Sequence, residues 1–310
     1  MKIFFVGFHI EGVKAFDFLT KNYNVVGLMT LNTDAASKRS GAFNFKTFSE
    51  EAKLPYYQVK HINDKSSVEI LKNHSPDLLI VLGWSQLLND EVLSIPTIGT
   101  IGAHASLLPK MRGSAPINWA IIKGEEKTGN TLMWLNIGVD TGKIIDQYEF
   151  KINLYDSCNT LYENVAESNR VMLERSLPLI AKKGSIGIAQ QENREDLLPR
   201  RKPADGLINF NQTSLELYNF IRALTRPYPG AFFKYRDLKV IIWKASYSNL
   251  FKTSNQTGVI LEYIYSFDEK DCAVLISTKD GAIIINEIET ENEILQGKDL
   301  HGFFKLNNKI

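Results

Sequence analysis

The first half of the chain alternates short apolar runs with stretches of helical periodicity, and this alternation constrains the fold more than any other feature. Continuous apolar runs of about four to eight residues are typical of strands buried on both faces of a sheet. Between them, apolar residues recur three and four positions apart, which predicts helices. Strands that alternate with helices favour βαβ units and therefore an α/β fold with a mostly parallel, Rossmann-like sheet.

The individual elements follow from this pattern. The expected strands of the first half are residues 2–8, 24–30, 77–82, 97–103, 131–136 and 144–151. The expected helices are residues 11–23, 64–74, 115–123 and 156–183. Asp156 or Ser157 can cap the last helix and Gly184 follows its end, which matches the residue preferences of helix termini.

The composition changes after residue 189. Residues 190–204 are polar and charged and contain proline, which predicts a linker between a first domain (1–189) and a second domain (205–310). The second domain begins with an amphipathic helix at 214–224. Short apolar runs follow at 231–235, 238–244, 259–265, 272–277 and 282–287. Strands at this spacing favour a smaller, OB-like β-barrel.

Charge, hydropathy and cysteine content exclude several classes of protein. Lys plus Arg number 36 and Asp plus Glu 35, and a balance this close to zero argues against a nucleic-acid backbone as the main partner. No apolar run reaches the ~18 residues of a membrane span, and the run at 2–8 is too short for a signal peptide. Cys158 and Cys272 are isolated, so neither disulfides nor a metal site is expected. We expect a cytoplasmic protein.

The segment 101–142 holds the residues best suited to catalysis. It contains neither a G-x-G-x-x-G nor a Walker motif, so a dinucleotide site or a P-loop is unsupported. His104 follows a predicted strand, and Asp140 lies between glycines in a predicted tight loop. If both strands end at one sheet edge, the two side chains converge there. A histidine beside a carboxylate suits acid–base chemistry, whereas a structural histidine and a turn aspartate are the alternatives.

This segment resembles the 10-formyltetrahydrofolate-dependent formyltransferase family, whose pattern is a His followed by S-L-L-P and R-G, then G-x-T and D-x-G. The matching positions are His104, Ser106–Pro109, Arg112–Gly113, Gly129–Thr131 and Asp140–Gly142. The resemblance extends over almost the whole chain. Residues 205–210 and 221–231 are similar to the second domain of methionyl-tRNA formyltransferases and of the formyltransferase domain that acts on UDP-4-amino-4-deoxy-L-arabinose.

The resemblance implies a chemistry and a cosubstrate, 10-formyltetrahydrofolate. An amine attacks the formyl carbon, His104 donates to the resulting oxyanion, and Asp140 orients the His and accepts the amine's proton. The resemblance also implies that the folate pterin lies against backbone near five residues. These are Leu82, Gly83, Trp84, Val139 and Gly142.

The chain departs from the family at Gly102, where an Asn that holds the formyl oxygen is usual. Glycine has no side-chain donor, so a backbone N–H, a water molecule or another side chain has to supply this hydrogen bond. Gln86, Asn118 and Asn130 are candidates by proximity in sequence. The alternative is a non-catalytic homologue that binds folate or a nucleotide.

Three features favour a UDP- or dTDP-linked amino sugar over initiator tRNA as the formyl acceptor. The turn 7–12, with His9 and Glu11, is similar to that of the aminoarabinose enzyme, although both residues can simply cap the first helix. The run 200–205 is similar to a segment of the sugar enzymes, although such runs are commonly solvated. The second domain carries 12 Lys plus Arg against 13 Asp plus Glu, or −1, whereas tRNA binding needs a basic face.

A nucleotide sugar requires cations for its pyrophosphate and an aromatic face for its base. The available cations are Arg112, Arg201, Arg222 and Arg226, and the available aromatic residues are Trp84, Trp119, Tyr228 and Phe232. The resemblance implies that Arg222 and Tyr228 approach the nucleotide. We expect His9, Arg112, Arg201, Arg222 and Tyr228 to bind this acceptor, whose formylation would serve surface glycan or polysaccharide synthesis. Methionyl-tRNA formylation, through a basic loop at 38–46, is the alternative, and a homodimer is left open.

Overall fold

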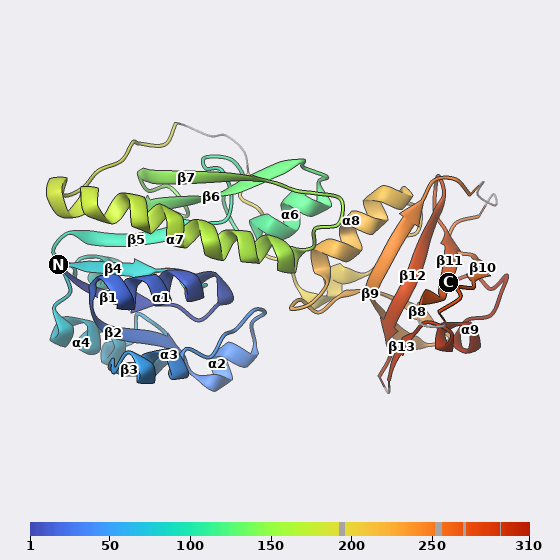
Figure 1. Cartoon of the computed structure of the whole chain (residues 1–310), viewed down its shortest axis with the longest axis horizontal. Helices are drawn as coiled ribbons and strands as arrows, with labels where there is room; N and C mark the ends of the chain where they lie inside the picture. The colour runs from blue at the N-terminus through green and yellow to red at the C-terminus, as the bar shows by residue number, and fades with distance from the viewer. Residues whose placement is uncertain (192–195, 252–255, 269–270, 292) are drawn as a thin grey trace. The chain divides into compact units, whose positions relative to one another are not determined.

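The computed structural model describes residues 1–191, 196–251, 256–268, 271–291 and 293–310, and these form two compact units (Figure 1). Unit 1 comprises Met1–Ile117, Lys127–Ile152 and Thr160–Arg200. Unit 2 comprises Asn118–Glu126, Asn153–Asn159 and Arg201–Ile310. Two short segments of the first half therefore belong to unit 2, and the domain boundaries expected at 189 and 205 stay a prediction.

Unit 1 is built on one seven-stranded sheet in the order β3-β2-β1-β4-β5-β6-β7, and β1 to β5 are parallel. The last two strands pair antiparallel with their neighbours. The strands are β1 (Lys2–Val6), β2 (Asn24–Leu31), β3 (Tyr56–Val59), β4 (Leu78–Val81), β5 (Gly99–His104), β6 (Lys127–Trp134) and β7 (Ile144–Lys151). The predicted Rossmann-like, mostly parallel sheet is confirmed. The sequence pattern missed β3.

Helices cover both faces of this sheet, and successive residues of β1 alternate between two cores. Ile3 and Phe5 pack with α1 and α7 residues in one core, whereas Phe4 and Val6 pack with α4 residues in the other. Burial on both faces is why these strands appear in the sequence as continuous apolar runs. The main helices are α1 (Val13–Asn22), α4 (Lys65–His74), α6 (Pro116–Ile122) and α7 (Cys158–Lys183).

Shorter helices complete unit 1, and their caps explain where they begin. They are η1 (Ile10–Gly12), α2 (Thr33–Ser37), α3 (Lys46–Glu51) and α5 (Asp90–Leu93). Asn32 accepts a hydrogen bond from Ala35 N at the start of α2, and Asn89 caps α5 in the same way. Among the described helices, even the 26-residue α7 lacks the apolar content that a membrane span needs.

Unit 2 is an antiparallel sheet with helices at its ends. The sheet order is β10-β11-β12-β9-β8, and β13 pairs with β12. Its elements are η2 (Pro203–Gly206), α8 (Ser214–Leu224), β8 (Ala231–Tyr235), β9 (Leu238–Ser248), β10 (Ile260–Ile264), β11 (Ala273–Ser277), β12 (Ala282–Glu289), β13 (Ile294–Gln296) and α9 (Asp299–Phe303). Among the described residues no ladder pairs β8 with β10, so closure into an OB-like barrel stays a prediction.

Candidate active site

The structure brings His104 and Asp140 together in unit 1. The His104 Nδ1 atom lies 3.5 Å from Asp140 Oδ2. The route differs from the expected one, because β6 is antiparallel to β5 and its last residue pairs with Ile101 rather than with His104. The loop between β6 and β7 therefore has to return along β5 to place Asp140 beside the histidine.

Backbone contacts fix the tautomer of His104, which is 8% exposed. Its Nε2 atom lies 2.8 Å from the Met111 carbonyl oxygen. Because a carbonyl oxygen only accepts hydrogen bonds, Nε2 carries the proton and donates it. The Nδ1 atom faces the Asp140 carboxyl group, and the two groups form an ion pair when Nδ1 carries a proton as well.

Hydrogen bonds on both sides hold the Asp140 loop. Gly113 N donates to Asp140 Oδ2 at 2.9 Å, which orients the carboxyl group. Asp140 has a φ of +53°, a left-handed conformation that is uncommon outside glycine. Gln190 Nε2 donates to the carbonyl oxygens of Asp140 and Gly142 at 2.8 and 2.9 Å. Gln190 thus holds the loop from a segment that the sequence predicted to be a linker.

Thr131 organises the Ser-Leu-Leu-Pro segment that follows His104. Its hydroxyl donates to the Ser106 carbonyl at 2.6 Å. The same oxygen accepts from Leu108 N at 3.1 Å and from Gln147 Nε2 at 2.9 Å. Thr131 is fully buried and pairs with His104 across β5 and β6, so this network fixes the chain immediately after the histidine.

A cleft lies beside Asp140, between the ends of β4, β5 and β6. Its walls are mostly apolar and are formed by Val81, Trp84, Gln86, Leu87, Leu88, Gly102, Ala103, Met133, Leu135, Asn136, Gly138 and Asp140. The Trp84 Nε1 atom is buried and has no acceptor among the described residues. An unpaired buried donor is costly, so the cleft suits a flat ligand that brings a hydrogen-bond acceptor to Trp84.

Comparison with known proteins identifies the family. Residues 14–177 match the formyl transferase family model, and residues 200–302 match the model of the formyl transferase C-terminal domain. The chain belongs to the formyl transferase family. The family predicted from the sequence is therefore confirmed.

Two curated relatives match nearly the whole chain and carry different names. The chain is 33% identical over 305 residues to the bifunctional polymyxin resistance protein ArnA of Wigglesworthia glossinidia brevipalpis, covering 97% of this chain but only 46% of that protein. It is 31% identical over 307 residues to the methionyl-tRNA formyltransferase of Clostridioides difficile, covering 97% of both chains. The chain thus spans about half the length of the ArnA relative and nearly all of the other.

A solved N-formyltransferase from Helicobacter canadensis, in complex with folinic acid and dTDP-3-aminofucose, has the same fold. It is 21% identical, covers 93% of this chain and all of that chain, and has a TM-score of 0.66.

The five residues that the family resemblance assigns to folate occupy different places around the cleft of this formyl transferase. Trp84 lines it. Leu82 is fully buried in the core, and Gly83, with a φ of +60°, lies against the His9 side chain. Val139 is half-buried, and a side chain at Gly142 would overlap the Trp134 carbonyl oxygen. Their contact with folate stays a prediction.

Leu135 fills the space that a side chain at Gly102 would need. A Cβ atom at position 102 would lie 2.6 Å from Leu135 Cδ2 and 2.9 Å from Leu135 Cγ. The chain therefore lacks the family's usual asparagine, and a side chain at this position would require Leu135 to move. Carbon atoms in ordinary contact are about 3.5–4.0 Å apart.

The three amides that the sequence suggested as replacements are engaged elsewhere. Asn118 Nδ2 donates to the Ala223 carbonyl, and Asn130 Nδ2 donates to Ser168 and Asn169. Gln86 lines the cleft, but both ends of its amide are bonded to backbone, at Lys60 and Ile62.

Asn136, which the sequence reasoning did not single out, also lines the cleft. Its Oδ1 atom accepts from Gly138 N at 3.2 Å and from the Thr141 hydroxyl at 2.9 Å. These bonds orient the amide, and no described residue accepts from its Nδ2 atom. The signal in the sequence was an Asn at the end of the predicted strand 131–136, four residues before the catalytic aspartate candidate.

His9 and Glu11 form a buried pair at the turn after β1. Glu11 N donates to His9 Nδ1 at 3.4 Å, so His9 caps η1, which was the structural alternative for these residues. Burial lowers the pKa of His9 to about 4 and raises the pKa of Glu11 to about 7. The pair is therefore mainly uncharged between about pH 5 and 6, and a contact of His9 with substrate stays a prediction.

The remaining predicted substrate residues lie in both units. Arg112, in unit 1, accepts a hydrogen bond from Leu198 N through its carbonyl oxygen. In unit 2, Arg201 stacks on Trp119 and donates to the Asp205 carbonyl. Arg222 donates to backbone carbonyls at Asn153 and Asp156, and Tyr228 lies in the turn after α8. Their contact with a nucleotide stays a prediction.

Proposed function

We propose that this formyl transferase moves a formyl group from 10-formyltetrahydrofolate to the amino group of a UDP- or dTDP-linked amino sugar. The observation that carries the reaction is the contact of His104 Nδ1 with Asp140 at 3.5 Å, beside a cleft with an unpaired buried donor. The observation that favours the acceptor is the charge of residues 205–310, which is −1.

The donor site fits a folate ring system. Apolar side chains line a cleft whose wall includes Trp84, and the buried indole N–H of Trp84 has no acceptor among the described residues. A pterin supplies both a flat ring and acceptor atoms. In this proposal Leu82, Gly83, Trp84, Val139 and Gly142 surround the pterin. The solved structure from Helicobacter canadensis, a complex with folinic acid, supports a folate cosubstrate.

The transfer proceeds by addition and elimination. The acceptor amine attacks the formyl carbon, forming a C–N bond and an oxyanion. Asp140 accepts the proton that the amine loses and delivers it to the folate nitrogen as the old C–N bond breaks. His104 donates to the oxyanion through the N–H that now faces the Met111 carbonyl, so the oxyanion replaces this backbone acceptor.

Asn136 is the side chain we assign to the role that Asn at position 102 usually fills. It shares the cleft with Gly102 and Asp140, and its Oδ1 atom is held by two hydrogen bonds. Its Nδ2 atom is then fixed in direction and can donate to the formyl oxygen. Preorganised donors of this kind are effective because they do not reorient during the reaction.

A nucleotide sugar suits this chain better than tRNA for electrostatic reasons. Phosphate contacts supply much of the affinity for a nucleic acid, and a domain with 12 cationic and 13 anionic residues offers little net attraction. The ArnA relative and the dTDP-3-aminofucose complex support the same choice. Surface glycan or polysaccharide synthesis and a cytoplasmic location are the finer parts of the proposal, and it does not specify an oligomeric state.

Methionyl-tRNA formylation is the second candidate, and a specific observation favours it. The Clostridioides difficile relative is named for this activity and matches the chain from end to end. The two candidates therefore have to be separated by assay.

The test is to incubate the protein with 10-formyltetrahydrofolate and a panel of UDP- and dTDP-linked amino sugars, with charged initiator tRNA in parallel. We expect mass spectrometry to find a formylated sugar nucleotide, and the Asp140→Asn variant to lose this product. Formylation of the tRNA with no sugar product would overturn the proposed acceptor. Ligand binding without any transfer would overturn the proposed activity.

A further inference from the structure

We propose that Gln190 is a positioning residue for formyl transfer, which acts by holding the backbone of the loop that carries Asp140. This inference rests on the proposed function, because Asp140 is the proton acceptor in that proposal. Residue 190 lies outside both stretches that match the family models, since the first match ends at residue 177 and the second begins at residue 200. It also lies in the segment that the sequence predicted to be a linker.

The loop between β6 and β7 has little backbone support of its own around Asp140. This residue has a φ of +53°, and a residue other than glycine keeps such a conformation only where its surroundings impose it. Among the described residues, no backbone N–H donates to the carbonyl oxygens of Asp140 or Gly142. The donors that hold these two carbonyl groups therefore have to come from a side chain.

The side-chain amide of Gln190 supplies both donors. Its Nε2 atom donates to the Asp140 carbonyl at 2.8 Å and to the Gly142 carbonyl at 2.9 Å. Because carbonyl oxygens only accept hydrogen bonds, an amide rotated by a half-turn would bring Oε1 against two other oxygens. The orientation that results leaves Oε1 buried without a donor among the described residues, which is unfavourable. The contacts with the loop therefore decide how this side chain lies.

The chain just before this glutamine is itself fixed to the sheet of unit 1. Ile144 and Ile188 exchange two backbone hydrogen bonds, at 2.8 and 2.9 Å. Trp134 Nε1 donates to the Ile186 carbonyl at 2.6 Å. Gly187 has a φ of +114°, and a Cβ atom there would lie 2.5 Å from the Ile144 carbonyl oxygen, so this close approach requires glycine. The amide therefore reaches the loop from a firmly held backbone.

The backbone position of Asp140 determines where its carboxyl group lies. The Oδ2 atom accepts from Gly113 N at 2.9 Å and lies 3.5 Å from His104 Nδ1. A shift of the Asp140 backbone would change both distances. Misplacement of a reacting group by about 1 Å can cost about 10²-fold in rate. Loss of the Gln190 donor should therefore slow the transfer although both proposed catalytic groups are still present.

The first measurement is hydrogen exchange of the full chain by NMR, which needs no acceptor. Gln190→Met keeps the length of the side chain and removes the donor, and Gln191→Met is the matched control because Gln191 is exposed. We expect Gln190→Met to speed the exchange of the Gly113 N–H about 10-fold, because the carboxyl group that accepts from it is no longer held. The Ser114 N–H, which donates to a backbone carbonyl, should keep its protection, and this separates a loosened loop from general unfolding.

The second measurement is single-turnover transfer from bound 10-formyltetrahydrofolate to whichever acceptor the protein formylates, a sugar nucleotide or charged initiator tRNA. We expect Gln190→Met to lower the rate at saturating acceptor about 10- to 100-fold, and Gln191→Met to leave it unchanged. Gln190→Lys keeps an N–H donor and should recover part of the rate. In the Asp140→Asn background, Gln190→Met should change the rate less than about 2-fold, because the group that it positions is already lost.

Two results would overturn the role of Gln190. One is that Gln190→Met leaves either the Gly113 exchange or the transfer rate at the value of Gln191→Met. The other is an equal loss of rate in the wild-type and Asp140→Asn backgrounds, which would show that Gln190 acts independently of Asp140. Formylation of tRNA alone, at a rate that depends on Gln190, would support the positioning role and reject the proposed acceptor. Absence of transfer to any acceptor would reject both.

Discussion

Gly102→Asn would place the family's usual asparagine in this chain, and the structure predicts that it destabilises the protein. The new Cβ atom would lie 2.6 Å from Leu135 Cδ2, about 1 Å inside ordinary carbon contact. Leu135 is half-buried and packs on one side against Leu108, Met133 and Ile144, so it can relieve the clash only by giving up these contacts and moving into the cleft. Overpacking of this kind costs about 1–3 kcal/mol.

A double-mutant cycle isolates this clash. Thermal and urea unfolding of Gly102→Asn, Leu135→Ala and the double variant give the free energy of each step. We expect Gly102→Asn to cost about 1–3 kcal/mol in the wild-type background and less than about 0.5 kcal/mol once Leu135 is shortened. Equal costs in the two backgrounds would refute the conclusion that Leu135 occupies the position of the missing side chain.

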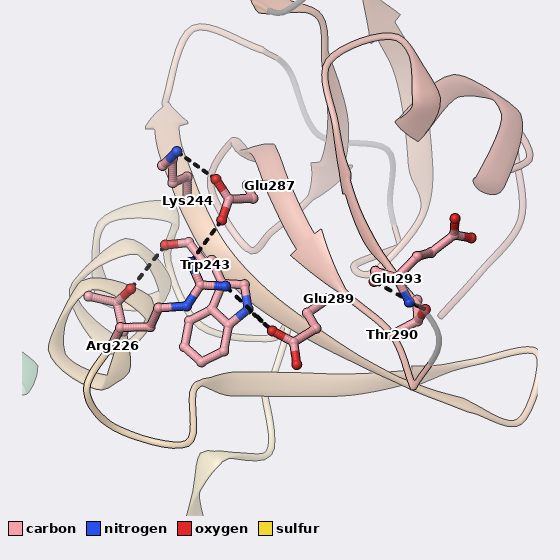
Figure 2. Close-up of polar contacts among 8 residues, drawn as sticks. Arg226, Trp243, Lys244, Glu287, Glu289, Thr290 and Glu293 are labelled. Carbon is pink, nitrogen blue, oxygen red and sulfur yellow. Dashed lines mark hydrogen bonds and ion pairs between the residues drawn. The ribbon is translucent and has the colours of Figure 1, made fainter. Parts of the chain in front are cut away.

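Three further predictions concern the charged groups. His104→Asn and Asp140→Asn should each lower single-turnover formyl transfer about 10²–10³-fold, with the double variant little worse than the poorer single one; multiplicative losses would show independent roles. The raised pKa of Glu11, about 7, gives a contribution to the free energy of unfolding that is fully present below pH 4.5 and is lost as the pH rises to 7. The lowered pKa of His9, about 4, gives a contribution that is fully present above pH 6.5 and is lost as the pH falls to 4. In the wild type these two pH dependences offset each other. Glu11→Gln leaves only the His9 dependence, so the free energy of unfolding in urea should rise by about 3 kcal/mol between pH 4 and 6.5 relative to wild type. An unchanged pH dependence would contradict this. Glu287→Gln should lower the free energy of unfolding by about 1–2 kcal/mol in thermal unfolding. The buried Glu287 carboxyl group pairs with Arg226 and Lys244, which are about half-exposed and stay solvated. No loss of stability would argue against the network in Figure 2.

The parallel core of the fold was predictable because its strands are apolar on both faces. The direction of β6 was not, since a buried strand has the same apolar pattern whether it runs parallel or antiparallel. Its start was also missed. Thr128 and Asn130 are polar yet buried, and Asn130 is stabilised by Ser168 and Asn169 on α7, far away in the sequence.

The pairing of His104 with Asp140 was predicted, although the strand argument behind it assumed two strands that end at one sheet edge, whereas β6 runs antiparallel to β5. The family resemblance named the same pair. The groups that hold them were not predicted. Gln190 lies in a polar stretch that resembles a linker, and only the folded chain brings its amide to the Asp140 loop. The relation of Leu135 to Gly102 likewise depends on the register of β5 and β6, which the sequence alone does not fix.

The acceptor is tested most directly by measuring kcat/KM for formyl transfer to a UDP- or dTDP-linked amino sugar and to charged initiator tRNA, with the same enzyme preparation and at physiological salt. We predict a higher kcat/KM for the sugar nucleotide, which falls when Asp140 is replaced by Asn. A higher kcat/KM for the tRNA, with a steep decline as salt increases, would contradict the proposed acceptor.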